Sequence, residues 1–179
     1  MKNKIKTRFD KLELDRKNLF SKLEKVNEDV LNLKPQENKW SIIQVIHHLY
    51  KSEQLSIVYI KRKLRDTQNI NKSGLVSIAR SLLLEWALRF PTKFKAPNNV
   101  SDVSDIAELE LYSTKWTRIR NDLIEIIENT DIEILKSDIF KHPSVGEMNM
   151  VHALKFMQAH FDNHKKQIDN ILQIKNNLV

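Results

Sequence analysis

The sequence predicts an all-α protein, a four-helix bundle with one extra shorter helix and long connections. Turn residues are scarce, since the 179 residues include 2 Gly and 4 Pro, where ordinary composition would give roughly 20 of the two together. This shortage excludes all-β sandwiches and barrels, whose many turns need both residues. Apolar residues recur every three or four positions along four long segments, and amphipathic helices of that kind bury their apolar faces against one another. No repeat or linker interrupts the pattern, so residues 1–179 are expected to form a single domain.

The first two long helices are predicted over residues 4–31 and from Ser41 to about Arg65. Pro35 and the polar residues around it end the first helix. Ser41 is placed as the N-cap of the second helix, because Gln44 three residues later completes a capping box. The apolar positions with helical spacing are Ile5, Phe9, Leu12, Leu19, Leu23, Val26 and Val30 in the first segment, and Ile42, Val45, Ile46, Leu49, Ile57, Ile60 and Leu64 in the second.

The second half of the chain predicts the shorter helix and two further long ones. The shorter helix is expected over residues 75–90, followed by an extended connection that Pro91 and Pro97 bracket. The long helices are expected over residues 105–129 and 149–176, and residues 130–148 form a connection with one short helical turn. Gly146 lies in that connection and is expected to need a positive φ. The long connections at 66–104 and 130–148 indicate a topology other than simple up-down-up-down.

Composition also limits the function. The chain has no Cys, which excludes disulfides, a thiolate metal site and a cysteine nucleophile. No run of about 18 apolar residues is present, so no membrane span is predicted. The N-terminus does not resemble a signal peptide, and a cytoplasmic protein is expected. The net charge of +7 is expected to be a solvated surface, because Lys and Arg are spread over every segment without a motif that reads nucleic acid.

Two histidines of the last predicted helix form a candidate metal-binding pair. His160 and His164 are four residues apart, and both lie on the apolar stripe with Met157 and Phe161. Imidazoles at this spacing leave one helix face in the same direction and can bind one ion, although buried histidines also occur as ordinary core residues. A third ligand has to come from another helix. The second helix offers His47 and His48, both on the flanks of its apolar stripe, and periodicity favours neither.

Two charged residues are predicted as catalytic candidates. Glu53 falls in the middle of the apolar stripe of the second helix, where a carboxylate is costly unless it is paired or near a metal. It either pairs with an Arg at a helix boundary or serves the site as a base or by orienting a histidine. Arg120 lies four residues from Trp116 near an apolar face, and either binds an anionic group of a substrate or pairs with a surface carboxylate.

Three segments resemble the DinB-like metal-binding four-helix bundle family. KWSIIQVIHHLYKSE at residues 39–53 is similar to the family segment W-S-x-x-Q/E-V-[LI]-x-H-L. HPSVGEMNMVHALKF at residues 142–156 is similar to the family's H-P-x-x-G-x-[LM] entry into the last helix. HFDNHKKQI at residues 160–168 matches the ending H-x-x-x-H-x-x-Q-I. Each motif alone is weak, but all three occur in the family's order and at its separation.

The resemblance implies a bundle that holds a divalent metal between the second and last helices. The implied ligands are His48, rather than His47, together with His160 and His164. Nickel or zinc is the expected ion, with manganese or iron as further candidates. Relatives include thiol transferases that use bacillithiol, mycothiol or glutathione, a maleylpyruvate isomerase and metal-dependent hydrolases. The members that give the family its name are induced by DNA damage, which implies a role in stress response.

The expected function is a metal-dependent transferase that activates a low-molecular-weight thiol for addition to an electrophile. Because the chain has no Cys, any sulfur nucleophile has to arrive as a cosubstrate. The close variant is a hydrolase that uses metal-bound water on a hydrolysable substrate. The alternative is a non-catalytic, stress-related bundle that binds a metal or another ligand. A homodimer is a further expectation, because family members often dimerise through helix faces.

Overall fold

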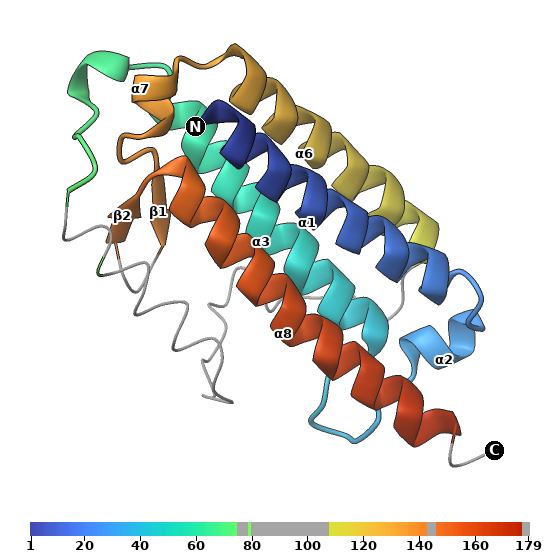
Figure 1. Ribbon diagram of the computed structural model, residues 1–179. Helices are drawn as coiled ribbons and strands as arrows, with labels where there is room; N and C mark the ends of the chain where they lie inside the picture. The colour runs from blue at the N-terminus through green and yellow to red at the C-terminus, as the bar shows by residue number, and fades with distance from the viewer. Residues whose placement is uncertain (75–78, 80–107, 143–145, 177–179) are drawn as a thin grey trace.

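The computed structural model describes residues 1–74, 79, 108–142 and 146–176. Its long helices are α1 (Lys2–Leu23), α3 (Ile42–Lys63), α6 (Leu109–Asn129) and α8 (Met150–Asn176), which lie side by side as a bundle (Figure 1). The shorter elements are α2 (Glu28–Asn32), the 3-10 turn η1 (Thr67–Asn69), α7 (Ile132–Leu135) and the hairpin of β1 (Phe140–His142) and β2 (Gly146–Met148). The predicted all-α bundle is confirmed. None of the described helices is long and apolar enough to cross a lipid bilayer.

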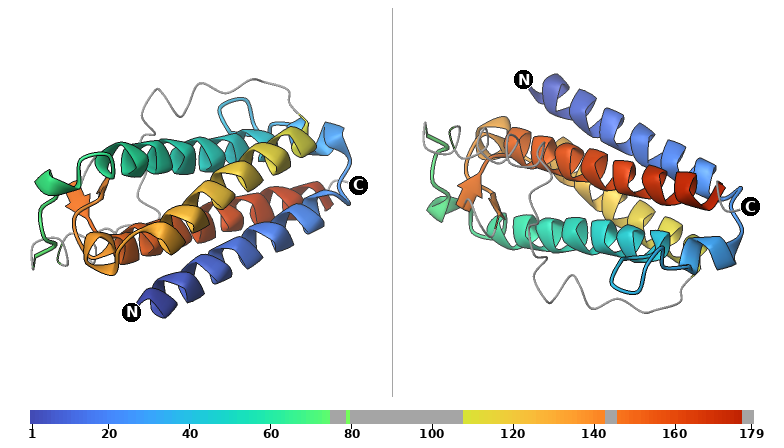
Figure 2. Two further views of the ribbon diagram at one scale, coloured as in Figure 1. Left: turned by 90° about the horizontal axis from the view of Figure 1, so that it is seen from above. Right: turned by 90° about the horizontal axis from the view of Figure 1, so that it is seen from below.

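The order of helix directions is not up-down-up-down. In Figures 1 and 2, α3 and α6 run in one direction, and α1 and α8 run in the other. Both α1 and α3 pack against α6 and against α8. The parallel helices α3 and α6 contact each other along their length. His47 of α3 contacts Tyr112 of α6, and further along Lys61 pairs with Asp122. The departure from simple alternation that the long connections predict is therefore confirmed.

The first predicted helix is wrong at its C-terminal end. A single helix was expected over residues 4–31, but α1 ends at Leu23 and the separate helix α2 begins at Glu28. Asn27 causes the second start, because its side-chain oxygen accepts a hydrogen bond of 2.8 Å from the N–H of Asp29. Asn side chains cap helix N-termini in this way and compete with helix continuation.

The predicted capping box of α3 is confirmed. The Ser41 hydroxyl accepts the N–H of Gln44 at 3.2 Å, and the Gln44 side chain accepts the N–H of Ser41 at 3.0 Å. Two N–H groups that the first helical turn leaves unpaired are thereby satisfied. This fixes where α3 begins, and with it the angular position of every later α3 side chain.

The connection before α8 contains more structure than the sequence predicts. The expected helical turn is present as α7, but the antiparallel pairing of β1 with β2 was not expected. Gly146 has a φ of 89°, which confirms the predicted positive φ and explains why glycine is suited to that position. Glu147 of β2 ties the hairpin to α3, because it accepts from Tyr59 at 3.2 Å and pairs with Lys63 at 3.0 Å.

Some sequence predictions fall outside the described residues. These are the shorter helix over 75–90, the connection bracketed by Pro91 and Pro97, and the first residues of the helix expected over 105–129. The remainder of the helix expected over 105–129 is confirmed as α6, and the helix expected over 149–176 is confirmed as α8.

The inward faces of the long helices and of the hairpin form one hydrophobic core. Its largest fully buried apolar side chains include Trp116 of α6, Phe140 of β1 and Phe161 of α8. Charged side chains are buried as well, among them Arg16, Glu53 and Arg120. Buried charges are expensive unless they are paired with an opposite charge.

Candidate metal centre

Three histidines from two helices converge between α3 and α8. His48 of α3 meets His160 and His164 of α8, and one ring nitrogen of each lies within 4.8 Å of the others. The Nε2 atoms of His48 and His160 are 3.1 Å apart. His48 is buried, whereas His160 and His164 are half-buried. Because α3 and α8 run in opposite directions side by side, residues far apart in sequence meet here (Figure 1).

The neighbouring His47 lies on a different side of α3. Its Nδ1 is 2.8 Å from the hydroxyl of Tyr112, and the two rings are perpendicular. His47 thus joins α3 to α6, while His48 faces α8. The structure brings to the cluster the histidine that the resemblance implies, although periodicity alone could not choose between the two.

Each histidine of the cluster has a neighbour that limits the rotation of its ring. Trp40 lies beside His48 with ring centroids 5.0 Å apart, and Phe156 stacks on His160 at 5.5 Å. Gln167 places its amide oxygen 2.9 Å from Nδ1 of His164. An amide oxygen only accepts, so Nδ1 of His164 carries the proton and its Nε2 keeps a lone pair. Such partners orient metal-binding histidines in known sites.

The environment favours the neutral form of the His160 and His164 imidazoles. Burial, followed by the neighbouring His164 and His48, holds the pKa of His160 well below its usual range. Burial also lowers the pKa of His164, and its hydrogen bond with Gln167 opposes that shift. Neutral imidazole is the form that binds metals, because protonation occupies the lone pair.

A fourth histidine lies near the cluster on the hairpin. His142 of β1 packs edge-on against Phe156 with ring centroids 4.7 Å apart, and Phe156 in turn stacks on His160. Burial lowers the pKa of His142 to about 4. From the sequence, His142 was identified only as the first residue of the motif at 142–156, and Phe156 was not singled out. The contact of His142 depends on the hairpin, which has no periodic signal of its own.

The residues present fit a divalent transition metal. In a tetrahedral site with metal–nitrogen bonds of about 2.0–2.1 Å, two ligand nitrogens lie roughly 3.3 Å apart, close to the 3.1 Å between His48 and His160. Imidazole donors suit zinc, nickel, copper and iron rather than magnesium or calcium. Within the part of the chain that the structure describes, the group has three protein ligands, a number that is typical of catalytic zinc sites, whereas structural sites have four.

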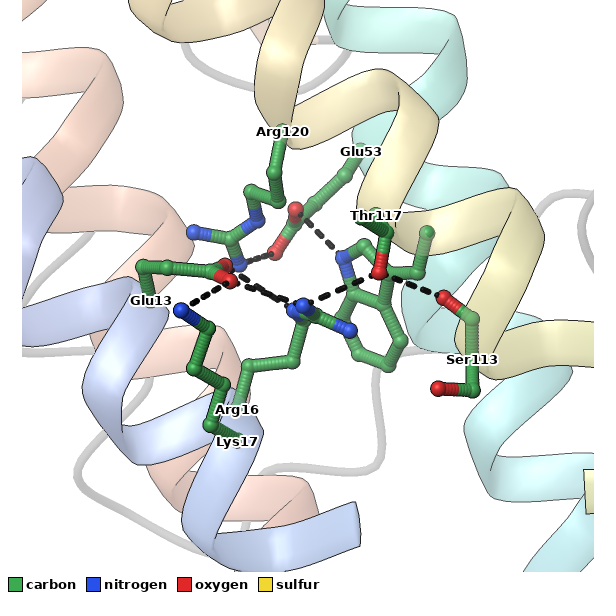
Figure 3. A network of polar contacts seen from close by, with 8 residues as sticks. Glu13, Arg16, Lys17, Glu53, Ser113, Thr117 and Arg120 are labelled. Atoms are coloured by element: carbon green, nitrogen blue, oxygen red, sulfur yellow. Dashed lines mark hydrogen bonds and ion pairs between the residues drawn. The ribbon is translucent and has the colours of Figure 1, made fainter. Parts of the chain in front are cut away.

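Glu53 and Arg120, the two predicted catalytic candidates, bind one another inside the bundle (Figure 3). Glu53 Oε1 accepts from Arg120 at 2.7 Å, and its Oε2 accepts from the indole N–H of Trp116 at 2.8 Å. Burial raises the pKa of Glu53, while Arg120 and Trp116 oppose that rise. Glu53 therefore pairs with an arginine, which was one of the two alternatives predicted for this residue. A catalytic role for either residue stays a prediction.

Arg16 of α1 lies beside the Glu53–Arg120 pair, and these three residues together with Glu13 are called the charged layer. Arg16 makes two hydrogen bonds with Glu13, at 2.7 and 2.9 Å, and a third with Thr117 of α6 at 3.2 Å (Figure 3). Arg120 is only 1% exposed, yet its Nε and Nη1 have no hydrogen-bond partner among the described residues. The described residues therefore leave these two nitrogen atoms without an acceptor.

Trp116 connects the charged layer to the helix turn that carries the histidines. Its indole N–H binds Glu53, and its ring lies 6.3 Å from that of Phe161. Phe161 directly follows His160 and is fully buried. No role for Trp116 was predicted from the sequence, because nothing in the periodicity shows where an indole N–H finds its acceptor.

Comparison with known proteins gives the same family as the motifs. The family model described as the DinB superfamily matches residues 11–168. The uncharacterized protein YuaE of Bacillus subtilis is 22% identical over 152 residues, which cover 85% of this chain and 89% of YuaE. YfiT of Bacillus subtilis, described as a probable metal-dependent hydrolase with an unusual four-helix bundle topology, superposes with a TM-score of 0.66 at 16% identity. The superposition covers 97% of this chain and 87% of YfiT. The chain belongs to the DinB superfamily.

Proposed function

We propose that this protein is a metal-dependent enzyme in which His48, His160 and His164 hold one divalent ion. The observation that carries the proposal is the meeting of three ring nitrogens within 4.8 Å, supplied by two helices. The low pKa values of His160 and His164 support it, because both side chains are ready to bind a cation at neutral pH. The description of YfiT as a probable metal-dependent hydrolase supports the same assignment.

The proposed reaction is attack on an electrophilic substrate by a nucleophile from solution. A divalent ion bound by three imidazoles supplies a Lewis acid, which lowers the pKa of a coordinated water to about 7 and deprotonates a coordinated thiol. The chain itself has no Cys, so it offers no thiol of its own. We place addition of a low-molecular-weight thiol first and hydrolysis second, with nickel or zinc as the ion.

The chain's own residues prepare the site for this chemistry. Gln167 holds His164 in the tautomer whose Nε2 is free, while Trp40 and Phe156 fix the planes of the other two rings. We assign Glu53 an orienting role, because both of its oxygens are occupied and it holds Trp116 against Phe161. We assign Arg120 to an anionic group of the substrate, because its Nε and Nη1 are buried without partners among the described residues.

The test is an activity panel with a matched histidine control. Zinc, nickel and manganese forms of the protein are assayed with bacillithiol, mycothiol and glutathione against an aromatic halide and maleylpyruvate, and without thiol against esters and amides. Turnover that needs a thiol supports transfer, and turnover without one supports hydrolysis. Both are expected to disappear in His48→Ala and to persist in His47→Ala. Metal binding with no turnover in any arm would contradict the enzyme assignment and favour a non-catalytic metal-binding bundle.

A further inference from the structure

A groove between α3 and α6 lies apart from the histidine cluster. Its volume is about 350 Å³, and the residues that line it belong to α3 and α6. These two helices are parallel neighbours in the bundle (Figure 2). Small-molecule sites in proteins are typically clefts of about 300–1,000 Å³. None of the three clustered histidines lines this groove, nor does any residue of the charged layer around Glu53. Nothing in the proposed metal chemistry uses it.

The floor of the groove is apolar. Tyr50 and Ile57 of α3 and Ile119 of α6 line it, and each is less than 9% exposed. Val58 stands on the α3 wall and is 58% exposed. An apolar body seated on this floor would remove Val58 from water, and burying such a side chain is favourable.

The rim of the groove is positively charged. Three cations line it, Lys61, Lys115 and Arg118, against the single carboxylate of Asp122, which leaves a net charge of +2. Lys61 already binds Asp122 at 2.9 Å. Lys115 and Arg118 are exposed and have no ion pair or hydrogen bond within the described ranges, so they are the charges that a ligand would meet.

We propose that the α3–α6 groove binds a small organic anion whose apolar body lies on Ile57 and Ile119 and whose acidic group meets Lys115 and Arg118. The charge of the rim selects an anion, and the apolar floor disfavours a purely inorganic one. A second copy of this chain fits less well, because each copy has a net charge of +7 and a positive groove.

The probe for the test is 8-anilinonaphthalene-1-sulfonate, an organic anion with an apolar body, followed by its fluorescence. Its uncharged counterpart, N-phenyl-1-naphthylamine, shows what the sulfonate contributes. The groove variant is Lys115→Gln/Arg118→Gln. The matched control is Lys4→Gln/Arg8→Gln, which removes one Lys and one Arg from exposed positions of α1. Val58→Trp fills the groove from an exposed position, and near-UV circular dichroism checks that every variant is folded.

We expect saturable binding of one sulfonate probe per chain. The groove variant and Val58→Trp should each weaken this binding by about tenfold or more. The control variant is expected to bind as the natural chain does, and the uncharged probe is expected to bind more weakly. Equal weakening in the control variant would overturn the proposal, since attraction would then follow net charge alone. Binding that Val58→Trp leaves unchanged, or the absence of saturable binding, would overturn it as well. These outcomes do not depend on the metal, so the test is separate from that of the proposed function.

Discussion

Glu53 and Arg120 form an ion pair of 2.7 Å in which neither side chain is more than 3% exposed. The pair lies where three helices meet, because Glu53 belongs to α3, Arg120 to α6, and Arg16 of α1 adds its positive charge nearby (Figure 3). Such a pair contributes little net stability compared with an apolar pair, but the loss of one partner leaves a buried charge alone. The layer therefore favours the helix arrangement in which both charges find each other.

Removing one partner of this pair is expected to be costly. Arg120→Met should lower the free energy of unfolding by about 3–5 kcal/mol, because Glu53 would stay buried without its cation. The double variant Glu53→Gln/Arg120→Met should recover part of that loss. Urea denaturation measures both. The comparison is Lys61→Met, which breaks a half-exposed pair with Asp122 and should cost no more than about 1 kcal/mol. Equal losses in the two single variants would contradict the account of the buried pair.

Gln167 is expected to control metal affinity without touching the metal. Gln167→Ala removes the acceptor that fixes the proton on Nδ1 of His164, and loss of such partners weakens metal binding by about 10–100-fold. Competition with a chelator of known affinity measures the effect. Gln173→Ala on the same helix is the control, because Gln173 is exposed. An affinity that Gln167→Ala leaves unchanged would mean that the hydrogen bond does not orient His164.

The metal-free protein is expected to lose stability as the pH falls from about 7 towards 4. The folded protein holds the pKa of His142 at about 4, below its usual 6.5, and also lowers the pKa values of His160 and His164. Between these limits the unfolded chain binds protons that the folded chain does not, so acid favours unfolding. Urea denaturation at several pH values tests this. His142→Gln should reduce the slope, and a stability that rises towards pH 4.5 would contradict the sign.

Lys2 is expected to stabilise α6 from another helix. Its ammonium group donates to the carbonyl of Glu128 at 2.7 Å and to that of Thr130 at 3.1 Å, which lie at the C-terminal end of α6. Cations at this end of a helix contribute about 0.3–1 kcal/mol. Thermal unfolding of Lys2→Met should show a loss of that size. Lys4→Met, two residues away and exposed, should show none, and equal losses would indicate a general charge effect.

The parts of the fold predicted from sequence are those that local patterns determine. Helical spacing located the four long helices, the Ser41 capping box located the start of α3, and the need for a positive φ explained Gly146. The break between α1 and α2 was missed because the apolar spacing continues across Asn27. The β1–β2 hairpin was missed because strands of three residues carry no readable alternation and depend on contacts with α3.

The site could be predicted only as far as one helix determines it. His160 and His164 share an apolar stripe, so their pairing follows from spacing alone. The choice of His48 over His47 depends on how α3 is rotated against α8 and α6, which flank positions do not reveal. The contact of Phe156 with His142 and that of Trp116 with Glu53 are tertiary too, and helical spacing does not reveal either of them.

The most direct test of the central claim is the metal content of the purified, untagged protein after incubation with zinc or nickel and removal of excess ion. The three-histidine site predicts about one ion per chain in the natural protein and in His47→Ala. It predicts loss of that ion in His48→Ala, His160→Ala and His164→Ala. Less than about a tenth of an equivalent in the natural protein, against the single ion that a three-ligand site holds, would contradict the metal site. Full retention of the ion in His48→Ala would contradict the proposed ligands.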